Sequence, residues 1–164
     1  MSADEYGRPG GFRLLPWLLG IILLVVAVPT AFLFSWVWDL VGSTPETVLA
    51  SNWGVRLPPR SSVIEHHEEA SFHGDGYRVT VVTVEPPVED GVGIFDISNM
   101  SSEPLTIEQS GLVVAAAKTL RPTNHLDMST PGLRTAELAQ GDGSVLLCVF
   151  DPSANRFFIY EELL

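Results

Sequence analysis

The stretch SVLLCVFDPSANRFFIYE, residues 144–161, decides the fold class of this chain. Two apolar runs, at 144–150 and 156–161, lie on either side of the pentapeptide DPSAN at 151–155. Asp-Pro favours the opening of a turn and Asn its close, because Pro presets φ and Asn tolerates a left-handed backbone. The pattern therefore predicts a C-terminal β-hairpin.

A second strand signal is YRVTVVTV at residues 77–84, where β-branched residues dominate. The apolar phase shifts after Val81, which indicates either a bulge or a strand that is covered on both faces. The tripeptide GDG at 74–76 tolerates positive φ. We therefore expect a hairpin that joins residues 62–67 to the strand at 77–84.

Two segments predict helices that pack on this sheet. Ser43 or Thr44 can cap a helix over residues 45–53, which has Pro and Glu in its first turn and ends at Gly54. Residues 105–120 include the run AAA, and their apolar spacing favours a second helix.

The other segments give weaker signals. Residues 93–97 predict a short strand, and residues 121–143 predict a long polar connection with a weak helical turn at 135–139. Together, these segments predict an α+β domain with a small antiparallel sheet, one or two packed helices and a C-terminal β-hairpin. About 125 residues suit a single domain of this kind.

Residues 14–38 precede this domain and contain no charged residue. As a helix they would span roughly 37 Å, which exceeds the ~30 Å hydrocarbon core of a bilayer, so we expect a tilted transmembrane helix. Trp17 near one end and Trp36 and Trp38 at the other fit the two membrane interfaces. The alternative is a cleaved signal peptide, which calls for a shorter apolar region and a small-x-small cleavage site.

The flanking charges predict how this helix is oriented. Arg8 and Arg13 precede it, whereas Asp39 and Glu46 follow it, and positive charge stays on the cytoplasmic side. We therefore expect a cell-membrane protein in three parts: a cytoplasmic leader at 1–13, a single transmembrane helix at 14–38 and an extracytoplasmic α+β domain at 39–164.

The predicted extracytoplasmic domain is strongly acidic. Seven basic and eighteen acidic residues follow residue 38, so this part alone carries the net charge of -11. Such a charge repels phosphate backbones, so we expect no nucleic-acid partner. The single cysteine, Cys148, lies in an apolar run and is expected to be a buried structural thiol.

One short segment gathers side chains that metals prefer. Residues 65–69 read EHHEE and residues 72–76 read FHGDG, and imidazole and carboxylate are typical zinc ligands. The candidate ligands are His66, His67, His73 and Asp75. Neighbours on a strand face opposite ways, so His66 and His67 reach one metal only across a bulge.

The same segment has plainer interpretations. The spacing of its histidines matches no strong zinc signature, which favours a solvated strand edge followed by a turn. The turn residues Gly74, Asp75 and Gly76 could also form a functional loop, although they lack the rest of a phosphate or calcium motif.

These observations favour a single-pass membrane protein that displays a non-enzymatic interaction or accessory domain outside the cell membrane. Its expected partners are the lipid bilayer and another envelope or membrane protein, with no cofactor. The alternative is a membrane-anchored metal-dependent hydrolase, or an ion or ligand sensor, that binds a divalent metal through His66, His67, His73 and Asp75.

Overall fold

The computed structural model describes residues 44–70, 75–86 and 92–164 of the chain. Their elements are α2 (Pro45–Trp53), β1 (Ser61–Ala70), β2 (Gly76–Val84), the 3₁₀ helix η1 (Gly93–Phe95), α3 (Ile107–Leu120), β3 (Arg134–Ala139), β4 (Val145–Asp151) and β5 (Arg156–Leu163). The strands form one antiparallel sheet in the order β1-β2-β5-β4-β3. The predicted α+β class is therefore confirmed.

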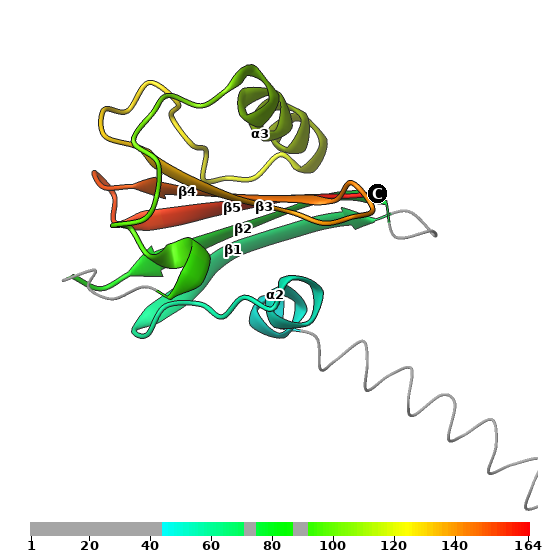
Figure 1. Ribbon diagram of the computed structural model, residues 1–164, viewed down its shortest axis with the longest axis horizontal. Coiled ribbons are helices and arrows are strands. Elements are labelled where there is room, and N and C mark those ends of the chain that lie inside the picture. Colours follow the sequence, from blue (N-terminus) through cyan, green and yellow to red (C-terminus); the bar gives the residue numbers. More distant parts are fainter. Residues whose placement is uncertain (1–43, 71–74, 87–91) are drawn as a thin grey trace, which may run out of the picture. The chain divides into compact units, whose positions relative to one another are not determined.

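The sheet is covered on both faces, with α3 on one side and α2 with η1 on the other (Figure 1). This explains the phase shift in β2: Val79 and Val81 pack under α3, whereas Val82 and Val84 pack on the α2 side. A strand that is buried on both faces reads as a nearly continuous apolar run. The bulge lies instead in β1, between Val63 and Glu65.

Both predicted helices form, and each begins at a threonine cap. The hydroxyl of Thr44 accepts a hydrogen bond from the N–H of Thr47, and α2 ends at Gly54 with φ of 67°. Thr106 and Gln109 form a reciprocal capping box at the start of α3. These caps satisfy backbone donors that the first turn leaves free.

The predicted C-terminal hairpin is also confirmed, and its strands β4 and β5 lie inside the sheet. In its turn, Asp151 accepts a hydrogen bond of 2.8 Å from the N–H of Ser153, and Asn155 adopts a left-handed backbone with φ of 50°. Cys148 is fully buried in this hairpin, as expected of a structural thiol.

Two local predictions were wrong. Residues 93–97 form no strand, because η1 buries the consecutive residues Ile94 and Phe95, which a strand would place on opposite faces. The expected helical turn at 135–139 is the edge strand β3, which pairs with β4 along its length. Pairing with β4 here overrides the helix propensity of Ala, Glu and Leu.

Within the described ranges, neither helix has the length and hydropathy that crossing a membrane requires. The predicted membrane segment at 14–38, with Trp17, Trp36 and Trp38, lies outside those ranges.

Candidate functional site

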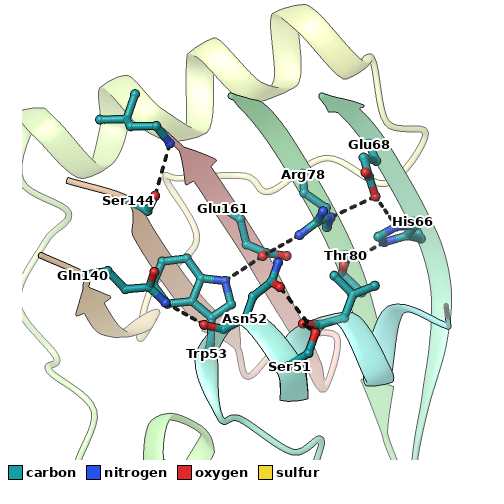
Figure 2. Close-up of polar contacts among 12 residues, drawn as sticks. Ser51, Asn52, Trp53, His66, Glu68, Arg78, Thr80, Gln140, Ser144 and Glu161 are labelled. Carbon is teal, nitrogen blue, oxygen red and sulfur yellow. Dashed lines mark hydrogen bonds and ion pairs between the residues drawn. The ribbon is translucent and has the colours of Figure 1, made fainter. Parts of the chain in front are cut away.

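The last strand, β5, carries a carboxylate into the interior of the domain, on the sheet face that α2 covers (Figure 2). Glu161 is 0 % exposed. Its Oε2 accepts a hydrogen bond of 2.7 Å from the indole N–H of Trp53 and one of 2.8 Å from Nη1 of Arg78. Residues from α2, β2 and β5 thus meet at one buried oxygen.

The guanidinium of Arg78 lies between two carboxylates. It is 5 % exposed, sits opposite Glu161 in the β2–β5 register, and donates through Nε to Oε2 of Glu68 at 3.0 Å. The hydrogen bond from Arg78 lowers the pKa of Glu68, whose side chain is 41 % exposed. When both carboxylates are ionised, this three-residue cluster therefore carries one negative charge in excess.

Of the two carboxylates, Glu161 is the one whose charged form is less favourable. Burial raises the pKa of Glu161, and the attraction of Arg78 offsets only part of this effect. The other oxygen of Glu161, Oε1, is the one buried side-chain nitrogen or oxygen atom without a hydrogen-bond partner in the described part of the chain. An unsatisfied buried oxygen costs about 1–3 kcal/mol, so Glu161 is held here against its own desolvation.

The network reaches the sheet edge through His66. Its Nδ1 shares a hydrogen bond of 2.9 Å with the hydroxyl of Thr80, and its Nε2 lies 3.8 Å from Oε2 of Glu68. Burial and the nearby charge of Arg78 lower the pKa of His66. The polar path therefore runs from α2 across β5 and β2 to the edge strand β1.

Glu65 is the centre of a separate cluster on the α3 side of the sheet. Its carboxylate accepts hydrogen bonds from the backbone N–H groups of Thr123 and Asn124, from the Asn124 amide and from the ring of His67. Burial would raise the pKa of Glu65, but these hydrogen bonds lower it to about 2. Asn124 also accepts a bond of 2.9 Å from Arg156. Glu65 thus joins the edge strand β1 by hydrogen bonds to residues 123 and 124, in the connection that follows α3.

The predicted metal ligands are only partly placed by the described residues. His66 and His67 lie on opposite faces of the sheet, as their neighbouring positions require, and each contacts a different glutamate. Asp75 is exposed next to Gly76, whereas His73 and Gly74 lie outside the described ranges. Across those ranges, no three metal-binding side chains come together. The four-residue metal site stays a prediction.

An apolar groove opens on the α2 side of the sheet. It has a volume of about 570 Å³ and is bounded by the end of α2, the connection to β1, η1 and the edge strand β3. Its lining includes Val92, which is 81 % exposed, and Leu138. Arg56 is the one charged residue among the described residues that line it. Trp53 lines the same groove, so the groove and the Glu161 network share a side chain.

The sequence reasoning missed the Glu161 network, although one signal for it was present. In β5 the side chains of Phe157, Ile159 and Glu161 point to the same face of the sheet, because strand side chains alternate with a period of two. This alternation already placed a carboxylate on a face that the core covers. Arg78 stands at the matching position of β2. The contribution of Trp53 could not be read in this way, because 108 residues separate it from Glu161.

Comparison with known proteins adds no further constraint on this site. No protein-family model matches the chain, and neither a curated protein nor a solved structure matches it. The interpretation of the groove and of the buried network therefore rests on their geometry and chemistry.

Proposed function

We propose that this protein is a single-pass membrane protein whose extracytoplasmic domain is a non-enzymatic interaction module. The observation that supports this most is the apolar groove beside Trp53. We propose further that the groove receives an extended apolar segment of another envelope or membrane protein, and that this segment carries a carboxylate.

The composition of the groove supports an apolar occupant. Its lining includes the apolar side chains of Trp53, Leu57, Pro58 and Ile94. Aromatic and proline side chains offer large contact areas and lose little conformational entropy when they bind. An occupant that covers this surface gains the free energy of removing both apolar surfaces from water.

The charge in the groove supports a carboxylate on the occupant. Arg56 is exposed and has no ion pair with another described residue. The domain has a net charge of -11, so an exposed arginine next to an apolar groove is a local positive charge on a mainly negative surface. A guanidinium binds a carboxylate with two parallel hydrogen bonds, which fixes the orientation of the bound segment.

The position of the groove in the chain supports a partner in the same membrane. Only six residue steps separate Trp38, at the end of the predicted membrane helix, from Thr44 at the cap of α2. A chain of that length reaches roughly 20 Å at most. A short connection of this kind favours a partner from the same membrane over a partner free in solution.

Photo-crosslinking of the full chain in intact cells tests the groove. A photoreactive residue at Val92 should give an adduct whose crosslinked peptide is apolar and contains Asp or Glu, whereas the same residue at exposed Ala154 should not. Arg56→Glu should abolish the adduct, while Arg56→Lys should keep most of it. Arg60→Glu is the matched control, since it makes the same charge change outside the groove lining.

Two results would contradict the proposal. One is an adduct at Val92 that survives Arg56→Glu, because the occupant would then not use the arginine. The other is a chain that alkaline carbonate releases from membranes, or a C-terminal reporter that is active only in the cytoplasm, because either would remove the anchor or its orientation.

A further inference from the structure

The outer face of α3 carries two large apolar side chains, Ile107 and Val114, where a surface helix is normally polar. The residues opposite its buried side are Ile107, Gly111, Val114 and Lys118, and all four are exposed. Ile107 is 88 % exposed and Val114 is 54 % exposed. α3 is the outermost layer on its side of the sheet (Figure 1). Because the opposite side of α3 already packs on the sheet, folding of the domain alone does not account for this outer stripe.

We infer that this stripe is a self-association surface, on which α3 of a second copy of the chain packs antiparallel about a two-fold axis. A two-fold contact must be self-complementary, because the same surface faces itself. The register that also pairs the charges described below is the one in which Gly111 lies opposite Val114 of the second copy.

The apolar residues fit this register. A Cβ added to Gly111 would meet no atom within 4 Å, so the space above this residue is open. The absence of a side chain at Gly111 lets the facing helix approach closely, and Val114 of the second copy fills that space. In the same register Ile107 lies opposite Lys118 of the second copy, whose methylene stem can cover it.

The charges fit the same register. Glu108 is in the first turn of α3 beside the stripe, and Lys118 is the member of the stripe in the last turn. An antiparallel pair brings Glu108 of each copy beside Lys118 of the other, which gives two identical ion pairs. A parallel pair would instead place each charge beside its own kind. Charge complementarity therefore selects a second copy in the antiparallel orientation.

Charge exchange in the full chain, solubilised in mild detergent, tests this surface. Glu108→Lys and Lys118→Glu should each weaken the dimer about tenfold, because each replaces two attractions by two repulsions. The double variant should restore dimerisation to within about threefold of the parent chain. Val114→Arg should weaken it by more than tenfold, while Met128→Arg, a comparably exposed position off α3, should leave it unchanged.

Engineered thiols test the orientation, since the native Cys148 is buried and gives little background. Val114→Cys should crosslink efficiently through a short bismaleimide, because the two thiols would be offset by only about 4.5 Å along the helices. Ile107→Cys should not, because its offset would be about 16 Å. Equal crosslinking at both positions would overturn the antiparallel arrangement.

Other outcomes overturn the proposal as a whole. One is a chain that stays monomeric at the highest concentration that remains soluble. Another is a dimer that tolerates Val114→Arg and both single charge reversals, because it would then use a different surface. These results are independent of the groove experiment, which probes the opposite face of the sheet.

Discussion

Glu161 and Arg78 show how much a single buried charge can constrain this domain. Each is almost fully removed from water, and the two side chains are paired at 2.8 Å. Removing one partner of a buried ion pair is costly because the remaining charge stays buried without compensation. Replacing both partners by apolar residues is often neutral, because the desolvation cost disappears along with the attraction.

We therefore predict that Glu161→Leu lowers the free energy of unfolding by about 3 kcal/mol, because it removes the fully buried one of the two carboxylates that pair with Arg78. Adding Arg78→Met should recover most of this loss. Chemical denaturation of the parent chain, both single variants and the double variant gives the coupling free energy between the two side chains. If the double variant is no more stable than Glu161→Leu, the stability lost in Glu161→Leu does not come from the charge left on Arg78.

Glu65 illustrates the opposite case, a carboxylate that the folded state holds in its charged form. Its folded-state pKa of about 2 lies below the ordinary value of 4.5, so the unfolded chain binds more protons between these pH values. The stabilisation is therefore complete above about pH 4.5 and is lost as the pH falls toward 2.

We predict that Glu65→Gln lowers the free energy of unfolding by about 1–2 kcal/mol at pH 7. The difference from the parent chain should shrink below pH 4.5 and disappear near pH 2. Thermal unfolding across this range measures it. Glu69→Gln, the same change at an exposed position of the same strand, is the control. A deficit of Glu65→Gln that stays constant down to pH 2 would argue against the charged carboxylate.

At the scale of the element, α2 is held at its C-terminal end. The indole of Trp53 bonds to Glu161, and the Gln140 amide donates a bond of 2.6 Å to the carbonyl of Asn52 (Figure 2). Leu49 is its one fully buried side chain. With so little apolar contact, α2 depends on these polar bonds more than α3 does.

We predict that Trp53→Phe increases amide hydrogen exchange in α2 about tenfold and leaves exchange in α3 unchanged. The physical reason is the loss of one hydrogen bond to a buried carboxylate, which contributes about 1.5 kcal/mol. Hydrogen exchange of the full chain, followed by mass spectrometry, measures the change. Ser51→Ala, on the exposed side of α2, is the control, and equal acceleration by it would mean that the indole bond does not hold the helix.

At the scale of the whole molecule, the sheet buries two apolar clusters, one on each face. Cys148 belongs to the cluster on the α2 side and is fully buried between β3 and β5. Burial raises the pKa of this thiol, so it is both inaccessible and poorly ionised in the folded domain. Its reactivity therefore reports on the opening of the sheet.

We predict that Cys148 reacts with thiol reagents only as fast as the domain unfolds globally. Its labelling rate should rise with denaturant with the same dependence as the unfolding transition. A chain with Ser102→Cys, at an exposed position, should label at that added thiol immediately. Fast labelling of Cys148 in native buffer would mean that the hairpin opens locally, without loss of the rest of the fold.

The sequence alone determined the elements whose signals are local. The hairpin β4–β5, the strand β2 and the helix α2, with its cap expected at Ser43 or Thr44, follow from turn chemistry, β-branched runs and capping residues. These signals act over a few residues, so no distant contact is needed to read them.

Only the tertiary structure decided the features that depend on distant partners. β3 became a strand because β4 offered it hydrogen bonds, and the bulge fell in β1 rather than in β2. The meeting of Trp53, Arg78 and Glu161 spans most of the domain. Which side chains converge on a buried carboxylate depends on strand order, and strand order is set by the packing of the whole sheet.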